Sequence, residues 1–236
     1  MSTRSGTASA ARTALLAWLG GIGAATAEAL AHRQQTSIGS ARATLAAAAA
    51  DGLLARTRPL ADQPSLYTLT PVGLRAARVQ GLQPCRVSAA NALHLIACAR
   101  VAVALERCYP DHHVMGEREL RREQRLTGRP LACARLSGGA PGCGALHCPD
   151  MVLWPDARGW SVPIAVEVEL AVKAPRRLAA ICRAWARCRE VAGVLYLAAP
   201  AAERALMRAI ADADASPRVL VVPLDALDPG EPLSPG

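Results

Sequence analysis

The feature that most limits the fold is the alternation of segment types after His147. Short apolar runs alternate there with segments of helical periodicity, a pattern typical of a layered α/β module. We expect strands at 147–154, 161–170, 194–197 and 219–222, and helices at 175–190 and 201–213. Residues 156–159 are the expected turn between the first two strands, and Pro163 favours an edge position or a bulge at the start of the second.

The first 80 residues follow a different pattern, in which three short helices precede two strands. The first helix is expected at 11–19 and should end at Gly20-Gly21. The second should run from an N-cap at Thr26 to about His32, and the third from Ser37 or Ser40 to Asp51, with Gly52 as its stop. The strands are expected at 53–58 and 65–70, so the predicted order is helix, helix, helix, hairpin.

A long helix at 88–107 should connect the two regions. It has one apolar stripe, suited to packing between modules or against a second copy of the chain, and we therefore expect a homodimer. Pro110 interrupts it, and a short, strongly charged helix follows at 117–123. The predicted domains are 10–83, a connector at 84–112, 113–223 and a tail at 224–236.

Composition narrows the class of protein. Hydrophobic residues make up 52% of the chain, but alanine is abundant and phenylalanine is absent, so the cores should be small and built from leucine and valine. No run approaches the length of a membrane span, and residues 1–10 lack the apolar stretch of a signal peptide. We expect a cytoplasmic protein without membrane contact.

The charge favours a polyanionic partner. The formal net charge is +8, and the first 80 residues hold eight arginines against three acidic residues. Double-stranded DNA is the expected partner, and a solvated basic surface is the alternative.

Eight cysteines in an intracellular chain are expected to be thiols. A zinc site built from Cys133, Cys143, His147 and Cys148 is the alternative, although the paired C-x-x-C spacing typical of such sites is missing.

Lys173 is the only lysine, against 26 arginines. A lysine ammonium can orient a water molecule or contact a phosphate in ways that a planar guanidinium cannot. Lys173 therefore either has a chemical role at a reactive site or is a single lysine that remained by chance in an arginine-rich chain.

Three carboxylates are predicted to share one face of the first strand pair. If Pro155 lies opposite Trp160, Asp150 faces Ala165, and alternation puts Asp150, Glu167 and Glu169 on the same face. Clustered carboxylates repel one another unless a cation lies between them. Oxygen ligands indicate Mg²⁺ or Mn²⁺.

Two stretches resemble winged-helix regulators: Asp51-Gly52-Leu53-Leu54 and Tyr67-Thr68-Leu69-Thr70-Pro71-Val72-Gly73. The resemblance implies a winged helix-turn-helix whose third helix enters the major groove of DNA. Many such modules instead bind proteins. The residues implied to face bases or phosphates are Gln35, Ser37, Ser40, Arg42, Arg56 and Arg58.

Most of residues 10–222 resembles the replication-relaxation family of plasmids and mobile elements. The residues that carry this resemblance are Glu119, Pro149-Asp150, Glu167, Glu169 and Lys173. It implies an α+β protein with a C-terminal PD-(D/E)xK nuclease-like domain, in which these residues are catalytic. Nucleases of that fold read Glu-x-Lys on the second strand. Here Glu169 stands at the lysine position, and Lys173 follows four residues later.

Two functions remain open. The first is a metal-dependent DNA phosphodiesterase acting in replication or mobilisation, with Asp150, Glu167 and Glu169 as metal ligands. The second is a non-catalytic winged-helix regulator with a degenerate nuclease-like domain.

Overall fold

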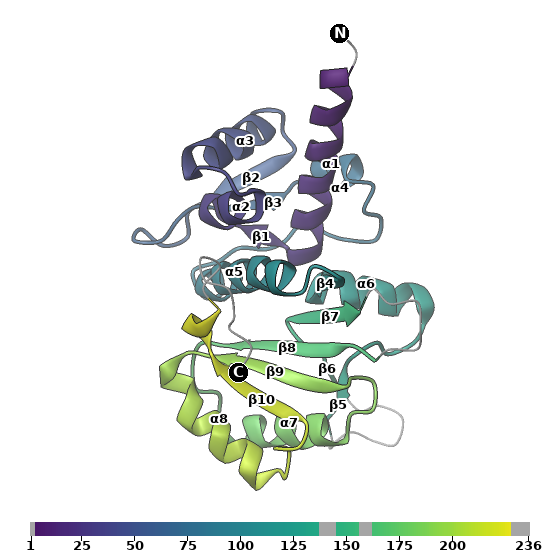
Figure 1. Cartoon of the computed structure of the whole chain (residues 1–236), viewed down its shortest axis with the longest axis vertical. Helices are drawn as coiled ribbons and strands as arrows, with labels where there is room; N and C mark the ends of the chain where they lie inside the picture. Colours follow the sequence, from purple (N-terminus) through teal and green to yellow (C-terminus); the bar gives the residue numbers. More distant parts are fainter. Residues whose placement is uncertain (1–2, 137–144, 156–161, 228–236) are drawn as a thin grey trace. The chain divides into compact units, whose positions relative to one another are not determined.

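The structure, a computed structural model, describes residues 3–136, 145–155 and 162–227, with side chains from residue 10 onward. Within these ranges the chain is an α+β protein with eight α-helices and both parallel and antiparallel strands. It divides into two compact units, Met1–Val103 and Ala104–Gly236, coloured along the chain in Figure 1. The boundary falls inside helix α5 (Ala92–Cys108).

The first unit contains the predicted three helices and hairpin, in the predicted order. Two short elements, β1 and α4, were not predicted. The three strands form an antiparallel sheet in the order β1-β3-β2. The elements are α1 (Thr3–Ile22), β1 (Ala24–Ala25), α2 (Ala27–Gln34), α3 (Ile38–Ala50), β2 (Leu54–Thr57), β3 (Leu66–Leu69) and α4 (Pro71–Ala76).

The helix caps follow from local sequence as predicted. The Thr26 hydroxyl accepts a hydrogen bond from the N–H of Ala29, and Ser37 accepts one from Ser40, both at 3.1 Å. After α3, Gly52 has a positive φ of 70°, a conformation that glycine adopts without strain. These signals set the start of α2 and α3 and the end of α3.

The prediction that the first helix ends at Gly20-Gly21 is wrong, because α1 continues to Ile22. A Cβ atom on Gly20 would lie 3.3 Å from Leu69 Cδ1, so this glycine permits close packing against β3. Gly73 is more tightly constrained, since a Cβ there would lie 2.1 Å from the Leu53 carbonyl oxygen. Both glycines are packing positions.

The core of the first unit is built mainly from leucine and alanine. Leu15, Leu16 and Leu19 of α1 pack with Leu30 of α2 and Leu45 of α3. Alanine allows these helices to approach closely.

The second unit is organised around a five-stranded mixed sheet in the order β10-β9-β8-β7-β4. Strands β8, β9 and β10 are parallel, whereas β7 and β4 run antiparallel to their neighbours. Strands β5 and β6 form a separate two-stranded sheet. The elements after α5 are β4 (His112–Gly116), α6 (Glu117–Thr127), β5 (Ala134–Arg135), β6 (Leu146–His147), β7 (Met151–Pro155), β8 (Ile164–Glu169), α7 (Pro175–Arg187), β9 (Gly193–Ala198), α8 (Pro200–Asp212), β10 (Val219–Pro223) and the short 3₁₀ helix η1 (Leu224–Ala226).

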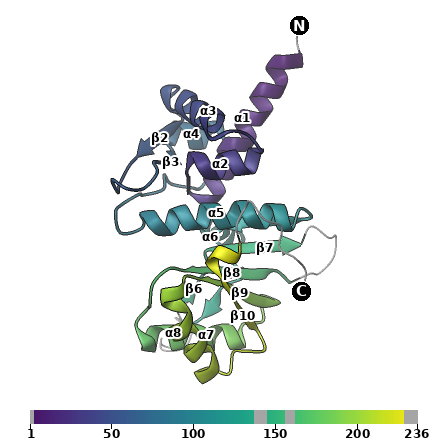
Figure 2. The same ribbon diagram turned by 60° about the vertical axis from the view of Figure 1, so that its left-hand side comes forward.

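Helices α7 and α8 lie side by side against the sheet (Figure 2). Ile181 and Trp185 of α7 and Leu206 of α8 pack with Ala165 of β8 and Tyr196 of β9. Each helix forms the crossover connection between two parallel strands, because parallel neighbours cannot be joined by a tight hairpin turn. This buried layer supports the carboxylate-bearing end of β8.

Two predictions about the strand pair need correction. The strand expected at 147–154 is divided into β6 and β7, because Pro149 has no N–H to donate between them. Strand β8 is central, so the edge position is wrong; Pro163 lies just before the strand begins. Strand β4 was not predicted at all.

The register also differs from the prediction. Ala165 pairs with Val152, not with Asp150. The difference is two residues, which leaves every side chain on its predicted face because the side-chain period of a strand is two. The expected turn at 156–159 and Trp160 lie outside the described residues.

None of the helices described is both long and apolar enough to span a membrane.

Candidate functional site

Asp150 is anchored to two neighbouring elements of the second unit. Its Oδ2 atom accepts a hydrogen bond from the Val168 N–H at 2.8 Å. Its carbonyl oxygen accepts one from the N–H of Glu117, the first residue of α6, also at 2.8 Å. The Pro-Asp segment is therefore fixed beside the C-terminal end of β8.

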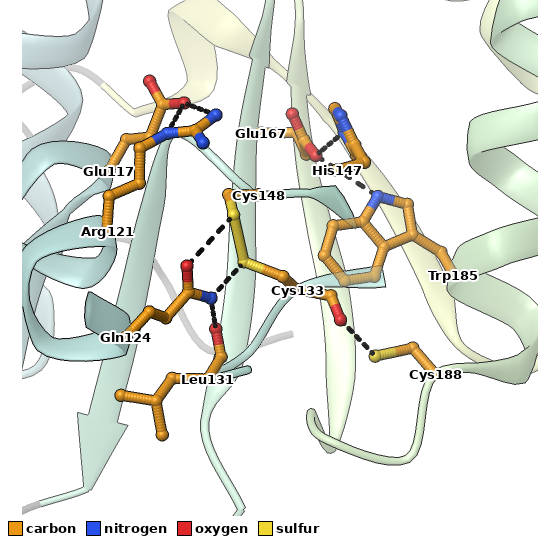
Figure 3. Close-up of a disulfide and its surroundings, with 10 residues drawn as sticks. All are labelled: Glu117, Arg121, Gln124, Leu131, Cys133, His147, Cys148, Glu167, Trp185 and Cys188. Carbon is orange, nitrogen blue, oxygen red and sulfur yellow. Dashed lines mark hydrogen bonds and ion pairs between the residues drawn. A yellow bond between two sulfur atoms is a disulfide. The ribbon is translucent and has the colours of Figure 1, made fainter. Parts of the chain in front are cut away.

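Glu167 lies on β8 and is only 3% exposed. Its Oε1 atom lies 2.6 Å from Nε2 of His147, and the indole N–H of Trp185 donates to the same oxygen at 3.2 Å. Figure 3 shows the two rings approaching this one oxygen from different elements. Burial of a carboxylate is costly unless it is paired and hydrogen-bonded, and these two contacts provide that pairing.

Glu167, Asp150 and Lys173 share one electrostatic environment. Burial raises the pKa of Glu167, while the hydrogen bond and charge of His147 oppose that rise. Asp150 adds to the increase and Lys173 counteracts it. Asp150 and Lys173 therefore both influence the pKa of the buried Glu167.

Glu169 is 5% exposed and forms an ion pair with Lys173, four residues later. The ammonium of Lys173 is turned back towards the strand from which the chain has just emerged. Its side chain keeps 31% exposure, so the charge remains at the surface of the unit.

Glu119 has other neighbours. Oε1 of Glu119 lies 3.9 Å from Nε2 of His113 on β4. Burial raises the pKa of Glu119, His113 lowers it, and Glu123 and Arg122 make smaller opposing contributions. These neighbours differ from those of the Asp150–Glu167 pair.

The fit to a divalent cation rests on two carboxylates. Oxygen atoms from Asp150, Glu167 and Glu169 do not form a three-ligand cluster with all atoms within 4.8 Å. Mg²⁺ commonly takes one or two protein carboxylates and completes its shell with water and phosphate oxygens. Asp150 and Glu167 fit that donor set, whereas Glu169 already neutralises Lys173.

The prediction that a cation must relieve carboxylate repulsion needs revision. Glu167 has His147 and Trp185, and Glu169 has Lys173. Glu167 and Glu169 are therefore each paired with side chains of the same unit. A metal is compatible with this arrangement but is not required for charge balance.

Sequence reasoning did not assign His147 or Trp185 to the carboxylate site. Trp185 is fully buried on α7, where its spacing indicates only a core position. His147 was a zinc candidate, and its place shortly before Pro149-Asp150 is the one signal that could have linked it to the site.

Two cysteines are not thiols as predicted, because Cys133 and Cys148 form a disulfide. The Gln124 side chain spans this bond, with its amide nitrogen 2.7 Å from Sγ of Cys133 and its amide oxygen 3.7 Å from Sγ of Cys148 (Figure 3). Disulfide sulfurs are not thiolate ligands for zinc. His147 contacts Glu167 instead, and Cys143 lies outside the described residues.

In the first unit, the predicted DNA-contacting residues are all exposed. They are Gln35, Ser37, Ser40, Arg42, Arg56 and Arg58. They lie at the end of α2, at the start of α3 and on or beside β2. Arg56 donates to the Ser65 hydroxyl at 3.1 Å, which links the two strands of the hairpin.

Comparison with protein families gives a match to the model described as replication-relaxation, over residues 16–203. The chain belongs to the replication-relaxation family. The match confirms the resemblance found in the sequence and includes Asp150, Glu167, Glu169 and Lys173. Membership of the replication-relaxation family suggests a role in the replication or mobilisation of a plasmid or other mobile element. Neither the curated proteins nor the solved structures contain a match.

Proposed function

We propose that this replication-relaxation protein binds double-stranded DNA and hydrolyses a phosphodiester bond in a metal-dependent reaction, by nicking or cleavage. In this proposal the first unit is a winged helix and the second has a PD-(D/E)xK-like fold. The observation that carries it is the geometry at β8: Asp150 accepts a hydrogen bond from the N–H of Val168, between Glu167 and Glu169, and Lys173 pairs with Glu169.

The second unit has the residue types that phosphodiester hydrolysis needs. Asp150 and Glu167 would hold Mg²⁺ or Mn²⁺, which when bound activates water and stabilises charge on the phosphate. Lys173 remains partly exposed beside its partner Glu169 and would contact a phosphate oxygen by exchanging that ion pair. Arg176 and Arg177 are exposed in the first turn of α7, which gives this edge further positive charge for a nucleic-acid backbone.

The first unit supports DNA binding through the phosphate backbone. Arg42 is exposed on α3, and Arg56 and Arg58 are exposed beside the hairpin loop. The exposed face of α3 is otherwise rich in alanine, which offers few groups that can hydrogen-bond to base edges. We therefore propose that phosphate contacts supply most of the affinity.

The DNA-binding proposal is tested by the salt dependence of affinity. The double variant Arg56→Ala/Arg58→Ala removes two exposed cations of the hairpin region. We expect weaker binding to every duplex and a salt slope lower by about 1.8, because each phosphate contact contributes about 0.9. The matched control, Arg204→Ala/Arg208→Ala, removes two exposed arginines of α8. Equal effects of the two pairs, or no effect of the first, would contradict the assignment.

The catalytic proposal is tested on supercoiled plasmid carrying the cognate origin, with Mn²⁺. Wild-type protein should convert it to nicked or linear DNA. Asp150→Asn should abolish cleavage while keeping DNA affinity. Lys173→Arg should also keep DNA affinity but lose most of the cleavage activity, since a planar guanidinium cannot replace a compact ammonium. Glu203→Gln removes an exposed carboxylate of α8 and is the matched control.

Metal binding can be measured independently of cleavage. Mn²⁺ should raise the melting temperature of the wild-type protein relative to chelator, because a ligand that binds only the native state stabilises it. The rise should disappear in Asp150→Asn. A rise of equal size in both proteins would exclude Asp150 as a ligand.

A second candidate is a DNA-binding protein without catalysis. The observation that favours it is the internal pairing of Glu167 with His147 and of Glu169 with Lys173, which lets the carboxylates be buried without a metal. No cleavage of any origin plasmid, together with an unchanged melting temperature in Mn²⁺, would support this candidate over the nuclease.

A further inference from the structure

Two aromatic side chains fix one oxygen of Glu167. Nε2 of His147 and Nε1 of Trp185 both contact Oε1, at 2.6 and 3.2 Å. His147 precedes Glu167 in the sequence and lies on β6, whereas Trp185 follows Glu167 and lies on α7. A carboxylate held at one oxygen by two donors has a defined rotation, and so its second oxygen, Oε2, has a defined direction.

Both donors are held by packing. Trp185 is fully buried in the core beneath the sheet. The His147 ring meets it edge to face, with ring centroids 5.7 Å apart and an interplanar angle of 70°. The backbone of His147 is paired with Ala134 of β5. Each donor is thus fixed by contacts that do not involve Glu167.

We propose that His147 and Trp185 are positioning residues that orient Glu167 for a divalent cation. They retain Oε1 for the protein and direct Oε2 to the metal. This inference rests on the proposed function, because it assumes that Glu167 is a ligand. Groups that hydrogen-bond to a metal ligand keep it in its binding orientation, and their loss typically weakens metal affinity 10- to 100-fold.

The alternative is that the three side chains only stabilise the fold. The two roles make different predictions for variants that keep the packing. Trp185→Phe retains a large aromatic ring and removes only the N–H donor. His147→Gln retains an N–H donor near the position of Nε2, whereas His147→Ala removes both the donor and the ring.

The test uses the full chain and Mn²⁺ alone, with affinity measured by isothermal titration calorimetry. We expect His147→Ala to weaken Mn²⁺ binding by about 10- to 100-fold and Trp185→Phe to weaken it by a smaller factor. His147→Gln should recover most of the wild-type affinity. Melting temperatures in chelator should be measured in parallel, so that a loss of fold is seen separately from a loss of affinity.

The outcomes separate this inference from the function on which it rests. If wild-type protein does not bind Mn²⁺, both the metal site and its positioning residues are refuted. If wild-type protein binds Mn²⁺ and the folded variants bind it equally well, only the positioning role is refuted. If His147→Ala fails to fold, Trp185→Phe and His147→Gln decide: a deficit in the first and recovery in the second are expected, and wild-type affinity in Trp185→Phe would overturn the inference.

Discussion

Loss of the Cys133–Cys148 disulfide should destabilise the second unit measurably. The two cysteines are separated by 15 residues, and cross-linking a loop of that length stabilises a protein by about 3 kcal/mol, chiefly by restricting the unfolded chain. For a protein of this size 1 kcal/mol shifts the melting temperature by about 2 to 4 °C. The expected decrease on reduction is therefore about 6 to 12 °C.

The measurement is a urea titration and a thermal melt, each with and without a phosphine reductant. Because both cysteine residues are buried, at 2% and 6% exposure, samples should be unfolded and refolded under each condition to ensure complete reduction. The Cys133→Ala/Cys148→Ala variant should melt low in both conditions. The control, Cys85→Ala/Cys108→Ala, removes two cysteines that are not part of the disulfide and should keep the full response to reductant.

Two results would refute this reasoning. One is a wild-type melting temperature that does not respond to reductant. The other is alkylation of Cys133 and Cys148 in unfolded protein that has never been reduced, detected by peptide mass spectrometry, which would show that the bond is absent in solution.

Three further outcomes can be checked directly. Gly73→Ala should destabilise the first unit by on the order of 3 kcal/mol or more, because its Cβ would lie 2.1 Å from the Leu53 carbonyl oxygen; a urea midpoint near that of wild type would contradict this contact. Thr26→Ala should cost about 1 kcal/mol in the same titration, since it removes the N-cap bond to Ala29. Burial raises the pKa of Cys182 to about 11, so at pH 8 only about one molecule in a thousand carries the reactive thiolate; iodoacetamide should modify Cys182 only after unfolding, and native-state labelling at the rate of an exposed thiol would be inconsistent with this burial.

Local signals in the sequence were sufficient for much of the first unit. Thr26 and Ser37 cap their helices through hydrogen bonds to residues three positions ahead, and such contacts depend on few distant residues. Strand β1 is different, because it consists of two alanines, Ala24 and Ala25, which pair with Thr68 and Tyr67 of the distant strand β3. Alanine has no strand preference, so only the tertiary contact defines β1.

Side-chain alternation predicted the carboxylates of the candidate site but not their partners. The observed register differs from the predicted one by two residues, which preserves the alternation on which that prediction rests, and Asp150 itself lies just before β7. The contacts of Glu167 with His147 and Trp185 span 20 and 18 residues and involve two other elements. No periodicity carries such information, because it depends on how α7 and β6 pack against the sheet.

Because Lys173 is the only lysine, the region just after the C-terminal end of β8 can be labelled selectively. An amine-selective reagent has one side-chain target in the whole sequence, Lys173, and that side chain is 31% exposed. Reductive methylation with ¹³C-formaldehyde would thus give one side-chain signal in an NMR spectrum, apart from that of the chain's α-amino group if it is free. Its chemical shift would report on the Glu169 ion pair without assignment of any other resonance.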